Sequence, residues 1–132
     1  MSGSPNRLLA TVFGVVYLLV GVLGFVVTGF SSFAGTSGDK LIVFEVNPLH
    51  NIVHLAIGAL LLAASRAVAT AKAADTGVGA VYLLVGILGL FLLDSSANIL
   101  ALNGADNVLH LASAIALLGV GLTADKRTPA AV

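Results

Sequence analysis

The sequence lacks cysteine altogether and has few charged residues. The missing cysteine excludes disulfide bonds, thiolate metal sites and cysteine-based catalysis. Only 9% of the 132 residues are charged, whereas a typical soluble domain carries about 25%. The net charge is zero and no basic cluster occurs, which argues against a nucleic-acid partner. Such a chain cannot cover a water-facing surface, so we expect the lipid bilayer to be its main partner.

Long hydrophobic runs take the place of the missing charges. Hydrophobic residues make up 58% of the chain, and the mean hydropathy is +1.09. Four stretches carry no charge, at 8–28, 49–65, 76–93 and 107–123. All four fall within the roughly 17–25 residues that a helix needs to cross a bilayer, the last three at the short end. The runs lack the two-residue alternation of membrane β-strands. The sequence therefore predicts an all-α fold, an integral membrane four-helix bundle forming a single domain over residues 1–132.

The chain contains an internal repeat. Residues 14–25 return at 79–90 with nine of twelve positions identical, and residues 51–56 return in related form at 107–112. This pattern predicts two tandem transmembrane hairpins, one at about 7–66 and the other at about 72–124. Each copy has an even number of spans, so both should share one orientation. That arrangement is the parallel type of internal repeat, with its axis along the membrane normal.

The basic residues predict the orientation of the bundle. Five lie at the termini and the central loop, and one lies on the other side. The five are Arg7, Arg66, Lys72, Lys126 and Arg127, and the single one is Lys40. Lysine and arginine concentrate on the cytoplasmic side of membrane proteins. We therefore expect a multi-pass protein of the bacterial plasma (inner) membrane, with both termini cytoplasmic.

Glycines and one tyrosine recur along one face of the first and third predicted helices. The residues are Gly14, Tyr17, Gly21 and Gly24 in one helix, and Gly79, Tyr82, Gly86 and Gly89 in the other. Their spacings of three, four and three residues form a seam of heptad type. Small residues let membrane helices approach closely, so the seams predict helix packing. The alternative is that they make room for a flat ligand. Both tyrosines lie deep in their spans, where each hydroxyl needs an internal partner.

A polar stripe follows the second and fourth predicted helices. The second helix carries Asn47, His50, Asn51, His54 and Gly58 on one face, and the fourth carries Asn103, Asp106, Asn107, His110 and Ala114 at the corresponding positions. Ionisable groups inside a membrane are costly and generally functional. We therefore predict a polar site between these helices in the outer leaflet. Its candidate residues are His54, His110, Asn51, Asn107, His50 and Asp106.

Three interpretations of this site remain open. In the first, the asparagines and histidines hydrogen-bond across the two helices of a structural or accessory membrane protein, whose partner is another membrane protein or a second copy. In the second, His54 and His110 bind a haem iron, or bind a divalent metal such as zinc together with His50 and Asp106. The asparagines then orient the rings.

In the third interpretation, the histidines belong to a proton-linked channel, transporter or pH sensor. The sequence places no charged residue deep in the first or third helix, which disfavours a continuous proton path. Motifs for a catalytic nucleophile or for nucleotide binding do not accompany the stripe, so we do not expect an enzyme.

The segment Asn47-Pro-Leu-His-Asn-Ile-Val-His-Leu-Ala-Ile-Gly58 also carries a family resemblance. It resembles the small, mostly actinobacterial four-helix membrane proteins that are grouped as a domain of unknown function. The resemblance extends over nearly the whole chain and includes the Tyr-Leu-Leu-Val-Gly segment of the first helix. It implies a four-helix membrane fold, and it implies no activity, cofactor or catalytic residue.

Overall fold

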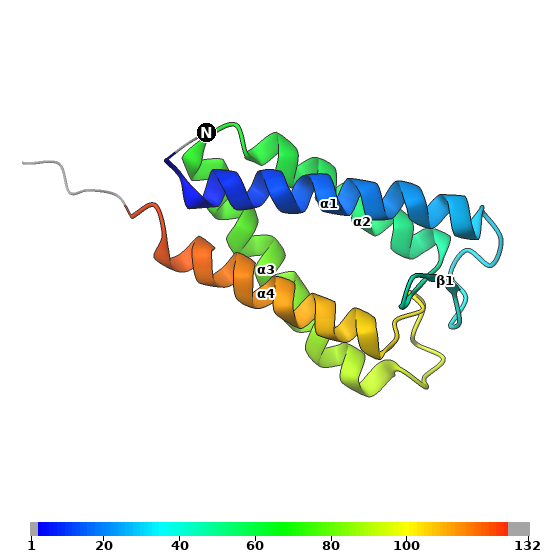
Figure 1. The fold of residues 1–132 in the computed structure, drawn as a ribbon. Helices are drawn as coiled ribbons and strands as arrows, with labels where there is room; N and C mark the ends of the chain where they lie inside the picture. The colour runs from blue at the N-terminus through cyan, green and yellow to red at the C-terminus, as the bar shows by residue number, and fades with distance from the viewer. Residues whose placement is uncertain (1–2, 127–132) are drawn as a thin grey trace, which may run out of the picture.

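The structure, a computed structural model, describes residues 3–126, over which the chain forms four helices and one small sheet. The helices are α1 (Pro5–Thr28), α2 (Pro48–Ala64), α3 (Val68–Leu92) and α4 (Gly104–Thr123). Strands β1 (Asp39–Leu41) and β2 (Phe44–Val46) pair antiparallel. Figure 1 shows α1 beside α2 and α3 beside α4, as two helical hairpins. The sheet lies at one end of the bundle, which we call the loop end. The start of α1 and the end of α4 lie at the opposite end, which we call the terminal end. The predicted all-α bundle of two hairpins is confirmed.

The helix boundaries differ from the uncharged runs at one important place. Helix α3 begins at Val68, so its first two turns contain Lys72 and Asp75, and only residues 65–67 connect it to α2. Helices α1, α3 and α4 are long and apolar enough to cross a membrane. Helix α2 has 17 residues, which span about 25 Å at 1.5 Å per residue. It is the shortest of the four because Asn47 and Pro48 fix its start beneath the loop end.

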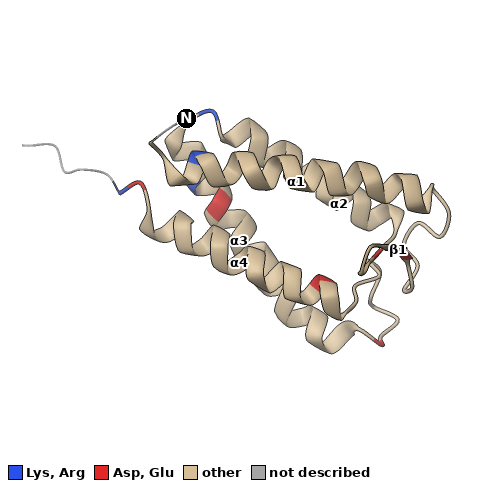
Figure 2. Ribbon diagram, viewed as in Figure 1, with Lys and Arg blue, Asp and Glu red and all other residues tan. Residues whose placement is uncertain are grey.

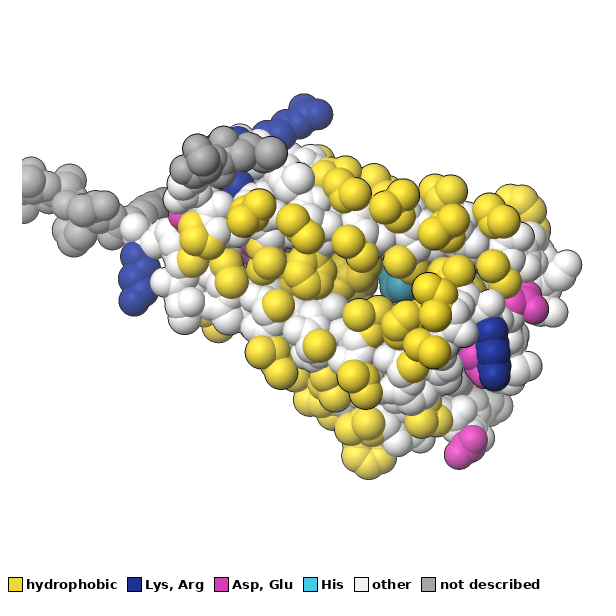
Figure 3. Space-filling view, viewed as in Figure 1, with side chains coloured by type: hydrophobic (Ala, Val, Ile, Leu, Met, Phe, Trp, Pro, Cys, Tyr) yellow, Lys and Arg dark blue, Asp and Glu magenta, His cyan; other side chains and the backbone are white. Residues whose placement is uncertain are grey.

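The hydrophobic surface agrees with a membrane location. Figure 3 shows hydrophobic side chains spread over both hairpins, and Figure 2 shows blue Lys and Arg segments of the ribbon near the terminal end. Lys40 lies in strand β1, at the loop end. Val26 and Ile115 are among the large apolar side chains that point outward. Arg127, one of the five basic residues used to predict orientation, lies outside the described residues.

Glycines bring the two helices of each hairpin into backbone contact. A Cβ atom at Gly58 would lie 2.8 Å from the carbonyl oxygen of Gly14, and one at Gly14 would lie 3.0 Å from that of Gly58. The other seam glycines also face the partner helix: Gly21 and Gly24 face Leu55 and Asn51, and Gly79, Gly86 and Gly89 face Leu118, Leu111 and Asn107. The seams thus determine how closely the helices pack within each hairpin.

The capping asparagines join the two hairpins at the loop end. Asn47 accepts a hydrogen bond from the His50 amide (2.8 Å) and donates one to the Ile99 carbonyl (2.8 Å). Asn103 caps α4 in the same way and donates to the Val43 carbonyl (2.9 Å). Each side-chain oxygen therefore caps its own helix, while the side-chain nitrogen holds a loop of the other hairpin. These bonds close the loop end over the interior.

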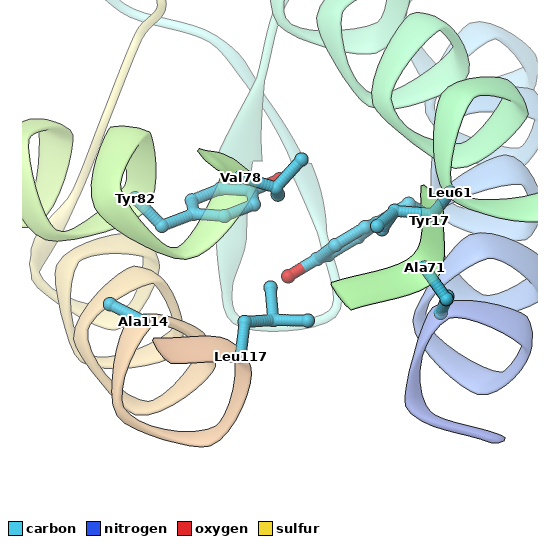
Figure 4. Close-up of a cluster of buried hydrophobic side chains, with 8 residues drawn as sticks. Tyr17, Leu61, Ala71, Val78, Tyr82, Ala114 and Leu117 are labelled. Atoms are coloured by element: carbon cyan, nitrogen blue, oxygen red, sulfur yellow. The ribbon is translucent and has the colours of Figure 1, made fainter. Parts of the chain in front are cut away.

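A small hydrophobic cluster fills the middle of the bundle. Figure 4 shows Tyr17 of α1 and Tyr82 of α3 extending from opposite hairpins toward the centre, with Leu117 of α4 beside them. Both tyrosines are buried, and their ring centroids lie 5.3 Å apart. Leu61 of α2 completes the contact between the hairpins. The polar stripe of the sequence lies next to this cluster, toward the loop end.

Candidate functional site

Three histidine side chains converge inside the bundle just below the loop end. His50 and His54 come from the first two turns of α2, and His110 comes from α4. Their ring centroids are 4.5 Å apart for His50 and His54, 6.0 Å for His50 and His110, and 6.4 Å for His54 and His110. One ring nitrogen from each residue lies within 4.8 Å of the other two. We call this group the histidine cluster.

The ring nitrogens of the cluster are buried and largely unpartnered. Each histidine is only 2–3% exposed. Among the described residues, both nitrogens of His50, both of His54 and Nδ1 of His110 lack a hydrogen bond of normal geometry. Backbone groups of Glu45 and Leu100 lie beside the His50 ring. Buried polar atoms are nearly always hydrogen-bonded in folded proteins, so five unpartnered nitrogens in one cluster require an explanation.

The two seam tyrosines form the wall of the cluster on the side facing the bundle centre. The Tyr17 ring stacks on His54 with centroids 5.4 Å apart, and the Tyr82 ring lies 5.1 Å from His110. The Tyr17 hydroxyl faces Ser113 and Tyr82 without reaching hydrogen-bond geometry. The tyrosines therefore fix the planes of two imidazoles, a role that the seam pattern alone did not predict.

The stripe asparagines point into their own hairpins rather than across the site. Asn51 donates to the Thr28 hydroxyl of α1 (3.0 Å), and its Oδ1 packs against Gly24. Asn107 packs against Gly89 in the same way, without a hydrogen-bond partner in the described structure. The cross-helix bonds expected between α2 and α4 are therefore not formed by these side chains. Gly24 and Gly89 instead provide the space that the two amides occupy.

Asp106 stands apart from the cluster because its carboxylate caps α4. Its Oδ2 accepts the backbone amides of Asn103 (2.9 Å) and Glu45 (3.3 Å). With Asn103 it forms a reciprocal capping box, which the Asn-x-x-Asp spacing at the start of the helix could have indicated. Asp106 therefore holds strand β2 over the site, and the group of potential ligands that the structure brings together is His50, His54 and His110.

Three imidazoles suit a transition metal better than a haem iron in this arrangement. Zinc binds imidazole nitrogen at about 2.0–2.1 Å, which sets tetrahedral ligands about 3.4 Å apart. The nitrogens of the cluster lie within 4.8 Å of one another, so binding one ion would draw them closer together. A haem held by His54 and His110 would need its porphyrin between the two rings. The His50 centroid lies 4.5 Å from that of His54 and 6.0 Å from that of His110, beside the line joining those two rings, where the porphyrin plane would extend. In Figure 3 part of a histidine is visible through a gap between the hydrophobic side chains of the two hairpins.

Comparison with known proteins places the chain in a family. Residues 7–123 match the family model described as Domain of unknown function (DUF4383). The chain belongs to this family. The matched segment contains the histidine cluster, both tyrosines and all four helices almost entirely. No curated protein and no solved structure matches the chain. The description of the family gives no activity, and the support for a small membrane protein comes from the three helices long and apolar enough to cross a membrane.

One buried ionisable residue was not predicted as part of any site. Asp75 is fully buried in the second turn of α3, where the sequence placed it before the start of the helix. It lies on the same stripe of α3 as Ala71, Val78 and Tyr82, at spacings of four, three and four. Extending the helical periodicity back from Tyr82 could have identified Asp75 as an inward-facing acid.

Proposed function

We propose that this protein is a membrane metal-binding protein in which His50, His54 and His110 hold one divalent transition-metal ion. The observation that carries the proposal is the convergence of three buried imidazoles whose ring nitrogens are mostly unpartnered. Imidazole suits zinc, copper, iron and nickel, and the chain has no thiolate to favour Cu(I). Zinc is the first candidate, because three histidines with one open position form a common zinc site.

The surroundings of the cluster support a metal ion. A divalent cation bound by neutral imidazoles leaves its positive charge buried in the bundle. Asp106 lies one turn before His110 on α4, and its carboxylate offsets that charge without being a ligand. The stacked tyrosines hold the rings of His54 and His110 in place. Ring orientation by neighbouring groups is a general requirement of metal sites.

We propose a binding role rather than an enzymatic one. The three histidines are almost inaccessible, and the β1–β2 hairpin and the asparagine contacts close the loop end above them. A substrate larger than water would need these loops to open. The metal would instead hold α2 and α4 together across the two hairpins, near the loop end.

Metal analysis of the purified protein tests this proposal. We expect about one equivalent of zinc, or of another divalent transition metal, per chain after incubation and desalting. We expect a loss of that metal in the double variant His54→Gln, His110→Gln. A Soret band should be absent in both proteins, and its presence in the wild type would favour haem. If the folded wild type retains no metal and the double variant is equally stable, the cluster is only a packing contact.

We also propose that the loop end faces the outside of the plasma membrane and that both termini are cytoplasmic. Arg7, Arg66 and Lys72 belong to the terminal end, and Lys40 belongs to the loop end, as the positive-inside rule requires. Since the chain has no cysteine, single cysteines report the orientation cleanly. In intact cells a membrane-impermeant maleimide should label Ala97→Cys and leave Arg66→Cys unlabelled. The reverse labelling would invert the proposed orientation.

A further inference from the structure

A second buried ionisable site lies at the terminal end, far from the histidine cluster. Asp75 of α3 is fully buried, and neither carboxylate oxygen has a hydrogen-bond partner among residues 3–126. Seven residues separate it from Tyr82 on the same stripe of the helix, which is about 10 Å along the axis at 1.5 Å per residue. Tyr82 in turn contacts His110. Asp75 is therefore a separate site, displaced toward the terminal end.

A set of polar contacts closes the terminal end around Asp75. Asp125 accepts three hydrogen bonds through Oδ2, from the Ser4 hydroxyl (2.7 Å), the Asn6 side chain (2.8 Å) and the Asn6 amide (3.1 Å). Lys72 donates from its ammonium group to the Ala124 carbonyl. We call these residues, Ser4, Asn6, Lys72, Ala124 and Asp125, the terminal clasp. It joins the start of α1 to the end of α4 across the two hairpins.

The charged groups around Asp75 do not neutralise an ionised carboxylate. Asp125 acts on Asp75 as a like charge, and hydrogen bonds from Ser4 and Asn6 hold the pKa of Asp125 below its usual range. The Lys72 ammonium is directed to Ala124, and Arg7 of α1 donates Nε to the Ser65 carbonyl. Helix α2 carries no Lys, Arg, Asp or Glu, and the acid of α4 is Asp106 near the loop end. An ionised Asp75 would thus be buried with no opposite charge, a state that proteins avoid by protonation.

We infer that Asp75 is a proton-binding site of this protein, a buried carboxylic acid that exchanges its proton with the terminal side when the clasp opens. Exchange toward the histidine cluster is blocked by the hydrophobic layer of Leu61, Val78 and Leu117 between the two sites. Opening the clasp exposes the carboxyl group to water, where it can release the proton. The bundle then contains two ionisable sites, each closed by contacts between the hairpins at its own end.

Infrared spectroscopy of the full chain in phosphatidylcholine vesicles tests this inference directly. At pH 7 the wild type should show the carbonyl stretch of a protonated carboxylic acid, and Asp75→Asn should lack it while remaining folded, because the amide closely resembles the neutral acid. Asp106→Asn, which alters the other buried aspartate, should keep the band. A wild type without the acid band at pH 7, or a band lost in Asp106→Asn and kept in Asp75→Asn, would overturn the assignment.

Should Asp75→Asn fail to fold, hydrogen–deuterium exchange of the same band in the wild-type background still decides the question. Transfer to D₂O shifts the acid band at a rate set by clasp opening. Asp125→Ala removes three hydrogen bonds to a charged acceptor and should speed this shift by about tenfold or more. Asn103→Ala, which removes the contact with the Val43 carbonyl at the opposite end, should leave the rate unchanged. Equal rates in the wild type and Asp125→Ala, or faster exchange in Asn103→Ala alone, would contradict access through the clasp.

Discussion

Replacing Gly58 with alanine is expected to destabilise the bundle by about 2–3 kcal/mol, within the range for inserting a group into a close-packed site. A Cβ at this position would lie 2.8 Å from the Gly14 carbonyl oxygen and 2.8 Å from the Leu18 amide nitrogen. Both are backbone atoms of α1, which cannot move aside as a flexible side chain can. The methyl group must therefore push α1 and α2 apart, and the packing between them is lost along their length.

Gly77→Ala is the matched control for this prediction. Gly77 lies in α3, and a Cβ there would meet no atom within 4 Å. The substitution should be neutral or should stabilise the protein by up to about 1 kcal/mol, because alanine favours the helix. Thermal unfolding in detergent, followed by circular dichroism, measures both variants. Equal effects of the two substitutions would mean that the glycine seam does not determine the contact between α1 and α2.

Substituting His50 with glutamine is expected to weaken metal binding by more than about 100-fold. Even the loss of a group that only supports a ligand typically costs 10–100-fold in metal affinity. His50 lies within 4.8 Å of the other two ligand nitrogens, so we expect the loss of its ring to remove one of the three ligands. Competition with a chromophoric chelator measures the affinity. The same loss is expected for His54 and for His110.

The sequence also allowed a metal site in which Asp106 is a ligand beside the three histidines. The variant Asp106→Asn distinguishes that site from one formed by the histidines alone. Because Asp106 caps α4 through Oδ2, its substitution should lower stability by about 0.5–1 kcal/mol through the helix dipole. Metal affinity should change by far less than in His50→Gln. An equally large loss of affinity in Asp106→Asn would instead make the carboxylate a ligand.

The helical periodicity of the sequence predicted which side chains share a face within each helix. His50 and His54 are one turn apart on α2, and His110 occupies the position of His54 in the second repeat, so a shared polar face followed from the spacing alone. The glycine seams were likewise readable, because small residues at heptad spacing have a direct steric meaning. These features depend on local geometry, which the sequence specifies.

Features that depend on contacts between the hairpins could not be predicted in the same way. The stacking of Tyr17 on His54 and of Tyr82 on His110 depends on how the helices are rotated against one another. Asp106 was grouped with the histidines because it lies on their face, although the capping box directs its carboxylate to backbone amides. The uncharged run does not reveal Asp75 as an inward-facing residue, because α3 begins eight residues before that run.

X-ray absorption spectroscopy at the edge of the bound metal tests the central claim most directly. For the zinc-loaded wild type we predict nitrogen neighbours at about 2.0–2.1 Å, with the outer scattering pattern of three imidazole rings. The pattern should fall to two rings in His50→Gln at a metal concentration high enough to saturate the variant. A spectrum without imidazole scattering, or one that is identical in the wild type and His50→Gln, would contradict a metal centre formed by His50, His54 and His110.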